Sequence, residues 1–273
     1  MILRLLLNKK CVRLAFLWLL GVAGLSLIFP IITGMRHEAM NFTHILEAPS
    51  AYFWLGTDSL GRDLLSRLLS GALISLGVGL LAVGLSILIG MTIGAVAGYY
   101  GGWVDKSFVT LVDLMLCFPV FFLILAVIAV LGPNIMNVII VIGVTSWMGT
   151  ARLVRAEVLT LKEREFILAS RALGAGDSRI LFLHLIPNAL GPVIVNAILG
   201  VSSAILTETA LSFLGIGVQP PTPSWGNILM DGKATLGVAW WLTLFPGLMI
   251  LLTVLSTNVI GEEFHKIIQG HRR

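Results

Sequence analysis

The chain contains 273 residues, of which 57% are hydrophobic and 12% are charged, and its formal net charge at pH 7 is +4. Soluble domains carry about 25% charged residues, so this composition and a mean hydropathy of +0.98 indicate a polytopic membrane protein. The basic residues gather at the ends of the apolar stretches, so we expect no nucleic acid partner. Cys11 and Cys117 are unclustered and the histidines are scattered, so we expect no metal site.

Apolar stretches predict six transmembrane helices in an all-α fold, since about 20 residues are needed to cross a bilayer. The run at residues 14–35 is interpreted as a retained first span, and a long second helix is placed at residues 72–98. Residues 114–151 hold two spans, because residues 132–134 interrupt them with the sequence Gly-Pro-Asn, which is typical of a turn. The fifth and sixth spans fall within residues 180–207 and 234–261.

Basic residues near the ends of the spans predict the orientation of the chain. With the N-terminus inside, the outer segments contain only Arg36, Arg62, Arg67 and Lys233, and all other lysines and arginines belong to inner segments. We therefore expect a multi-pass protein with both termini and the polar segment 157–188 in the cytoplasm.

The segment 157–188 is the one long charged stretch between apolar runs, and its pattern predicts two helices joined by a turn. Gly174 and Gly176 are expected to end the first helix, Asp177 and Ser178 to cap the second, and Pro187 to break the pattern before the next span. An ordinary cytoplasmic loop is the alternative interpretation.

Two features favour a docking function for this segment. Loops of this length are uncommon unless they are functional. The first predicted helix also carries a small and apolar face that suits a soluble partner, made of Phe166, Ile167, Ala169, Ser170 and Leu173.

The outer segment contains a second informative string, GTDSLGRD at residues 56–63. Gly56 and Gly61 permit tight bends and Asp58 is able to cap a helix, so the string alone predicts the capped start of a surface helix.

Gly90, Gly94 and Gly98 repeat every four residues along the second span, which lets another helix approach closely. The sequence leaves open whether that helix belongs to this chain or to a sister subunit.

Glu208 lies near the predicted end of the fifth span. An ionisable group at membrane depth is costly and usually faces a polar cavity or a partner, so Glu208 is a candidate for the pathway or for a gate. If the span ends before it, Glu208 is merely interfacial.

The polar segment resembles the EAA loop of permease subunits of binding-protein-dependent ABC importers. Ala169, Gly174 and Pro187 match that pattern, whereas Leu168, Ser170, His184 and Ile186 depart from it. The outer string is similar to the signature of the branch that imports dipeptides, oligopeptides and nickel, and the stretches at 98–105, 118–119 and 222–226 resemble the same branch in the same order.

The resemblance implies a type I ABC importer permease fold. Residues 1–70 would form the first helix and external segment, residues 71–265 the five-helix transmembrane domain with its coupling loop at 157–188, and residues 266–273 a cytoplasmic tail. The residues expected to couple the loop to an ATPase are Glu165, Ala169, Ser170, Arg171, Gly174, Ala175, Asp177, Arg179 and Pro187, with Arg171 and Arg179 making polar contacts. The external motif comprises Gly56, Thr57, Asp58, Gly61, Arg62 and Asp63, and with residues 215–236 it is the expected landing area for a binding protein.

The function implied is that of a permease subunit in the bacterial inner membrane, not an enzyme, which forms half of the translocation path. Its partners would be a sister permease, two cytosolic ATPases that bind ATP and Mg, an external substrate-binding protein and membrane lipid. Residues 226–233 miss the phosphate-binding P-loop pattern, so we expect no ATPase in this chain. Dipeptides or oligopeptides are the first choice of substrate and nickel or a metal chelate the alternative, while a secondary transporter and a membrane-embedded enzyme are the competing classes.

Overall fold

The computed structural model of the chain describes residue 6, residues 9–33 and residues 38–271. In these ranges the chain is mainly helical, and the β-type pairing it contains is a single bridge between Thr57 and Asp63. The helices are α2 (Lys10–Thr33), α3 (Leu64–Tyr100), α4 (Gly102–Leu116), α5 (Val120–Leu131), α6 (Ile135–Leu161), α7 (Glu165–Ala172), α8 (Asp177–Arg179), the π-helical turn η1 (Ile180–Leu185), α9 (Ile186–Phe213), α10 (Trp225–Lys233) and α11 (Trp241–His271).

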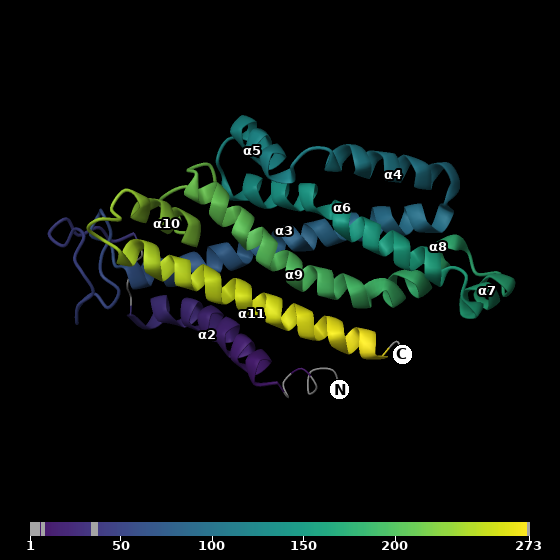
Figure 1. The fold of residues 1–273 in the computed structure, drawn as a ribbon, viewed down its shortest axis with the longest axis horizontal. Coiled ribbons are helices and arrows are strands. Elements are labelled where there is room, and N and C mark those ends of the chain that lie inside the picture. Colours follow the sequence, from purple (N-terminus) through teal and green to yellow (C-terminus); the bar gives the residue numbers. More distant parts are fainter. Residues whose placement is uncertain (1–5, 7–8, 34–37, 272–273) are drawn as a thin grey trace.

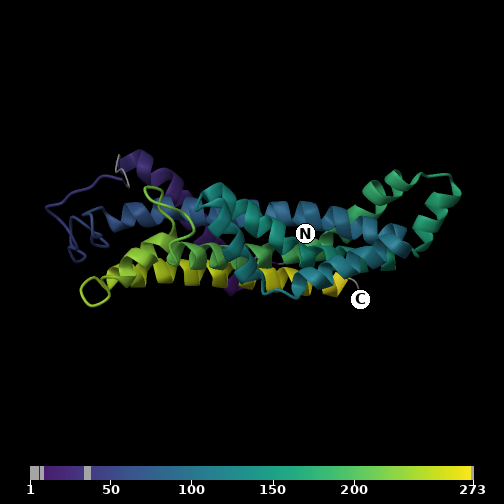
Figure 2. The same cartoon turned by 90° about the horizontal axis from the view of Figure 1, so that it is seen from above.

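The long helices form an elongated bundle with different structures at its two ends (Figures 1 and 2). The short helices α7 and α8 project at one end, and α10 with the segment before α3 covers the other (Figure 1). The N-terminal end of α2 and the C-terminal end of α11 lie toward the end that carries α7 (Figure 1). These two helix ends therefore lie on the side of the polar segment, while the predicted orientation in the membrane stays a prediction.

Among the residues that the structure describes, five helices are long and apolar enough to cross a membrane, and the number rises to six if α4 and α5 count as one bent span. The axes of α4 and α5 differ by 80°. The break falls at Phe118 and Pro119, because proline lacks the N–H of a continuing helix and restricts the residue before it. Residues 132–134 then separate α5 from α6, as predicted.

The uncharged runs predicted the spans but not their ends. Helix α3 begins eight residues before the expected start, at Leu64, because the side chain of Asp63 caps it by accepting from the N–H of Ser66 at 2.8 Å. Helix α6 continues beyond the uncharged run to Leu161, so Glu157 lies on a helix and not at the start of a loop. The sixth span was placed within residues 234–261, and α11 begins inside that range at Trp241, after α10 and a turn, and continues beyond it to His271.

The prediction that Pro187 breaks the helical pattern before the next span was wrong. Residues 177–213 form one continuous helical stretch, in which Pro187 occupies the first turn of α9. The preceding turn η1 is π-helical, and the N–H of Ile186 bonds to the carbonyl of Leu181. A proline ring clashes with the carbonyl four residues earlier in a regular α-helix, and the wider π turn gives it room.

The glycine repeat of α3 packs against α6 of the same chain, which answers the question that the sequence left open. A methyl group at Gly94 would lie 2.4 Å from the carbonyl oxygen of Ala151, and one at Gly90 would lie 2.8 Å from that of Trp147. A methyl group at Gly98 would lie 2.9 Å from the carbonyl oxygen of Arg155. The two backbones therefore touch along most of their shared length.

We expect Gly94→Ala to lower the free energy of unfolding by about 1–3 kcal/mol, because the added methyl group meets helix backbone that has to shift. Gly84→Ala is the matched control, since its methyl group on the same helix meets nothing within 4 Å. Thermal unfolding of the two purified variants in detergent measures the difference. Equal melting temperatures would show that the close contact is not needed for stability.

Candidate functional site

The hairpin, which we define as residues 162–185, joins α6 to α9 and contains α7, α8 and η1. Helix α7 ends in a Schellman motif, in which the N–H of Gly174 bonds to the carbonyl of Arg171 at 3.0 Å and that of Ala175 bonds to the carbonyl of Ser170 at 3.1 Å. Gly174 has a φ of 81°, which is left-handed backbone that glycine adopts without strain. The predicted glycine exit from the first helix is thus confirmed at Gly174, whereas Gly176 leads into α8.

One apolar side chain anchors the hairpin to the bundle. Ile167 is fully buried and packs in a cluster with Val154 and Val158 of α6 and with Ile180 and Leu185 of η1. The predicted apolar face of α7 is therefore divided between two directions. Ile167 points inward and Ser170 is half-buried, while Phe166, Ala169 and Leu173 are exposed. Leu168, which was not part of the predicted face, is exposed as well.

A polar contact ties the second half of the hairpin to the end of α3. The Tyr99 hydroxyl donates to Asp177 Oδ1 at 2.5 Å, and Arg171 Nη2 donates to the same hydroxyl at 3.4 Å. The guanidinium of Arg171 also lies 5.8 Å from the centre of the Tyr99 ring. Asp177 was expected to cap α8, but Gly176 occupies the capping position. The carboxylate of Asp177 instead accepts the hydrogen bond from the Tyr99 hydroxyl.

Other polar contacts make the base of the hairpin rigid. Lys162 Nζ donates to the carbonyl of Gly98 at 3.2 Å, and Arg155 Nη2 donates to Asp105 Oδ2 at 2.7 Å. These contacts join the end of α6 to the end of α3 and to α4. The base of the hairpin is therefore attached to α3 as well as to α6.

The remaining residues predicted for coupling lie on the outer surface of the hairpin or close to it. Ser170 and Ala175 are half-buried, and Ser170 Oγ is 3.5 Å from His184 Nε2. The exposed members are Glu165, Ala169, Gly174, Arg179 and Pro187. This surface is available for a partner protein.

At the end of the bundle opposite the hairpin, four charged side chains form what we call the clamp: Asp58, Arg62, Arg67 and Asp231. Asp58 Oδ2 lies 2.6 Å from Arg62 Nε and 2.5 Å from Arg67 Nη1. Arg67 Nη1 also lies 2.8 Å from Asp231 Oδ2, and Arg62 Nη2 lies 3.7 Å from the same oxygen. The two positive and two negative charges thus balance. Through these ion pairs, the string at residues 56–63 and Arg67 of α3 are both joined to Asp231 of α10.

Asp58 is fully buried and does not cap a helix, so that prediction was wrong. Its Oδ1 accepts from the backbone N–H groups of Leu60 at 2.8 Å and Arg62 at 2.9 Å, which closes a tight turn. Asp63 takes the capping position. Burial raises the pKa of Asp63, although the backbone N–H groups of Ser66 and Leu65 oppose that shift.

The glycines of the string permit close contacts that a side chain would prevent. A methyl group at Gly61, where φ is 69°, would lie 1.8 Å from the carbonyl oxygen of Asn41. One at Gly56, where φ is 83°, would lie 2.6 Å from that of Glu47. Thr57 is buried as well, and its carbonyl accepts from Trp241 Nε1 at 3.0 Å. The motif therefore organises the outer end of the bundle, and its buried side chains are not themselves a contact surface.

Sequence reasoning missed Arg67 and Asp231 as members of the clamp. They are far apart in the chain, and neither belongs to the string at residues 56–63. The available signal was a charged residue at the edge of an apolar run, where an ionisable group usually has a partner.

Glu208 lies inside α9, in the last two turns of the helix, which continues to Phe213. Its side chain is fully buried: Oε2 accepts from Ser75 Oγ at 3.1 Å, and Oε1 accepts from Ser212 Oγ at 2.7 Å. Ser75 Oγ in turn accepts from the N–H of Trp225, the first residue of α10, at 3.2 Å. Glu208 thus links α3, α9 and α10.

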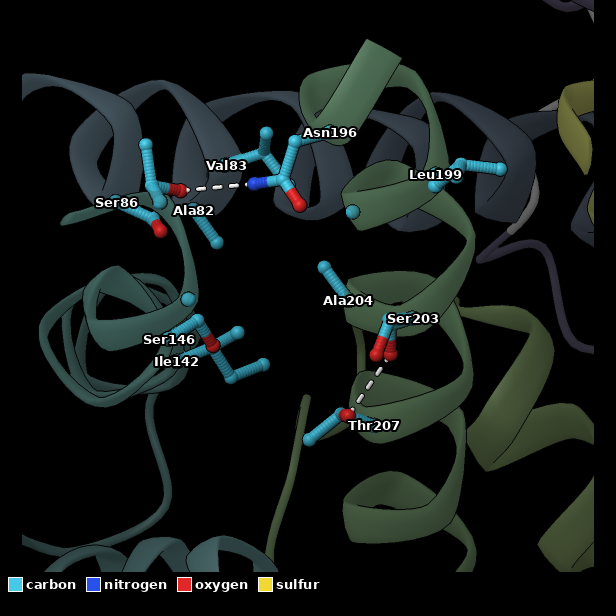
Figure 3. A pocket seen from close by; sticks show the side chains of 13 residues that line it. Ala82, Val83, Ser86, Ile142, Ser146, Asn196, Leu199, Ser203, Ala204 and Thr207 are labelled. Atoms are coloured by element: carbon cyan, nitrogen blue, oxygen red, sulfur yellow. Dashed lines mark hydrogen bonds between the residues drawn. The ribbon is translucent and has the colours of Figure 1, made fainter. Parts of the chain in front are cut away.

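A hollow of about 290 Å³ lies between α3, α6 and α9, and we call it the polar hollow (Figure 3). Its polar side chains are Ser86, Ser146, Thr150, Asn196, Ser203 and Thr207. Glu208 does not line the hollow, although the preceding residue Thr207 does. The residues of this hollow come from three separate helices, so no local pattern in the sequence identifies the site.

The Asp58→Asn variant is expected to lower the free energy of unfolding by about 3–5 kcal/mol, because it removes the fully buried carboxylate of the clamp and leaves two buried guanidinium groups with Asp231 alone. Asp231→Asn is the matched comparison and should cost less, since 26% of that side chain is exposed to solvent. Chemical denaturation in detergent compares the two. A smaller effect for Asp58→Asn than for Asp231→Asn would contradict the central position of Asp58.

Comparison with known proteins places these features in a family. Residues 90–270 match the family described as "Binding-protein-dependent transport system inner membrane component". The dipeptide transport system permease protein DppC of Alkalihalophilus pseudofirmus is 42% identical over 253 residues, which is 92% of this chain and 83% of the relative. The di/tripeptide transport system permease protein DppC of Pseudomonas aeruginosa is 46% identical over 217 residues, which is 80% of this chain and 72% of the relative. The glutathione transport system permease protein GsiD of Pectobacterium atrosepticum is 39% identical over 231 residues, covering 84% and 77%.

Proposed function

Because this chain belongs to the family of binding-protein-dependent inner membrane transport components, we propose that it is a permease subunit that imports dipeptides or oligopeptides. Family membership makes it a multi-pass transport subunit and not an enzyme. The relatives named above carry peptide substrates in their names, which favours peptides over the alternative of nickel or a metal chelate. A transporter without binding protein or motor does not fit this family.

The observation that carries the mechanism is the continuity between the hairpin and the polar hollow. Helices α6 and α9 flank the hairpin directly, and the same two helices form walls of the hollow. We infer that the hairpin docks on an ATPase and moves as a rigid body when the ATPases close. This motion then shifts α6 and α9 and changes access to the path without any intervening flexible loop.

The remaining parts of the transporter follow from this arrangement. ATP and Mg are bound by two cytosolic ATPases, the hairpin end and both termini face the cytoplasm, and a sister permease supplies the other half of the path. Phe166, Leu168 and Leu173 provide an exposed apolar surface for docking, and Arg179 adds a charge beside it. Arg171 acts indirectly, because its guanidinium packs on Tyr99.

The clamp end is the landing area for the external binding protein. The clamp holds α10 against α3, and Tyr52 and Trp54 in the preceding segment are 89% and 69% exposed. We propose the same three parts as the sequence suggests. Residues 1–70 form the first helix and the external segment, residues 71–265 form the transmembrane domain with the loop 157–188, and residues 266–273 form the tail. The family match at 90–270 falls mainly within the second part.

Gly174→Ala is expected to reduce coupling between the ATPases and transport, because alanine at a φ of 81° costs about 1–2 kcal/mol and weakens the Schellman motif. The measurement is substrate-stimulated ATP hydrolysis and peptide uptake by the reconstituted complex. Gly176→Ala is the matched control, since it has an ordinary φ of −69° and its methyl group meets nothing within 4 Å. If both variants couple like the wild type, the hairpin geometry is not the coupling element.

Glu208 is proposed to act as a positioning residue for the outer gate, because it joins α9 to the first turn of α10 through Ser75. Glu208→Ala should reduce peptide uptake by about tenfold at equal abundance, which corresponds to the loss of hydrogen bonds to a charged group. Glu262→Ala, which removes an exposed carboxylate from α11, is the control. Normal uptake by Glu208→Ala at unchanged abundance would remove Glu208 from the gating mechanism.

A further inference from the structure

The polar hollow lies at membrane depth and not at either end of the bundle. Ser86, Thr150 and Asn196 lie well inside α3, α6 and α9, away from the ends of these helices. Ser146 and Ser203 are exposed on its rim. Polar side chains at this depth are unfavourable against lipid and usually face other protein or a water-filled cavity. This face of the bundle therefore suits contact with water, substrate or other protein better than contact with lipid.

The lining of the hollow is polar but carries no charged side chain. It consists of five hydroxyl groups and one carboxamide, together with small or apolar residues. Each hydroxyl and the carboxamide both donate and accept hydrogen bonds. This chemistry matches the N–H and C=O groups of a peptide bond, which also offer one donor and one acceptor.

Two of the polar groups are already held in place by internal bonds. Asn196 Nδ2 donates to Thr150 Oγ1 at 2.9 Å, and Thr207 Oγ1 donates to the carbonyl of Ser203 at 2.8 Å. The first bond fixes the carboxamide so that its oxygen points into the space between α6 and α9 (Figure 3). The hydroxyl of Ser146 points into the same space from the opposite wall (Figure 3).

We propose that the polar hollow is a transient binding site for the amide backbone of the peptide in transit. The proposal rests on the function proposed above and specifies the part of the substrate that this chain contacts. Its volume of about 290 Å³ is at the lower limit of ligand pockets, which suits one short segment of backbone. Groups common to all peptides are recognised, so side chains contribute little to binding in the hollow.

Neutral recognition also suits transport. A site along a path has to bind strongly enough to admit the substrate and weakly enough to release it. Hydrogen bonds between neutral groups contribute less than those to charged groups, so the hollow does not hold the charged peptide termini as an ion pair would.

The test is uptake of labelled dialanine into proteoliposomes that contain the complete transporter with its binding protein. The double variant Ser146→Ala and Ser203→Ala removes two exposed hydroxyls without creating a large cavity. We expect it to lower dialanine uptake about three- to tenfold, as the loss of one or two neutral hydrogen bonds implies. Copurification of the sister permease and ATP hydrolysis stimulated by the binding protein should remain.

Thr92→Val is the control, since Thr92 is exposed elsewhere on α3 and its hydroxyl donates to the carbonyl of Leu88 at 2.8 Å. It should import dialanine at the wild-type rate. A second variant, Asn196→Asp, places a negative charge in the hollow and should slow uptake of aspartyl-alanine more than that of dialanine.

Each other result would overturn the proposal. Wild-type uptake by the double serine variant would show that the hollow does not bind the peptide, while the importer function stands. Loss of the sister permease during purification would identify the hollow as a subunit interface. If the wild-type transporter itself imports no dialanine but hydrolyses ATP, the peptide function and the hollow proposal both fail.

Discussion

The backbone contact between α3 and α6 is the constraint on which the rest of the structure depends. It brings the carbonyl of Ala151 to within contact distance of Gly94, so no side chain separates the two helices. In a membrane, where lipid is as apolar as leucine, such close packing replaces the hydrophobic effect as a source of helix association. The contact fixes α6, and α6 in turn carries the hairpin at one end and a wall of the polar hollow along its length.

Much of the fold could be predicted from the sequence, because long apolar runs identify the segments that cross a membrane. The ends of the helices could not, since uncharged residues mark the lipid region and not the end of a helix. The cap at Asp63 starts α3 before the uncharged run begins, and α6 passes Arg152 and Arg155 without interruption. Pro187 misled for a related reason: a proline in the first turn of a helix, after a π-helical turn, does not break it.

The candidate sites differ in how far apart their residues lie in the sequence. The hairpin was predicted correctly in outline because a Schellman motif is local, and Gly174 with its neighbours contains the whole signal. The clamp joins Arg67 to Asp231, and the polar hollow combines residues of α3, α6 and α9. Such sites have no local pattern, and only the packing of the helices brings their residues together. For the same reason the partner of the glycine repeat could not be identified from the repeat itself.

Charge is distributed in a way that fits a substrate path controlled from its ends. Ion pairs join separate helices at the clamp and at the base of the hairpin, and Arg152 of α6 also pairs with Asp113 of α4 part-way along the bundle. The hollow between them has only neutral polar groups. A charged group there would bind one class of peptide too strongly, whereas hydroxyls and an amide favour passage of many. The ion pairs therefore hold the helices to one another, whereas the lining of the hollow stays neutral, as the transport path proposed above requires.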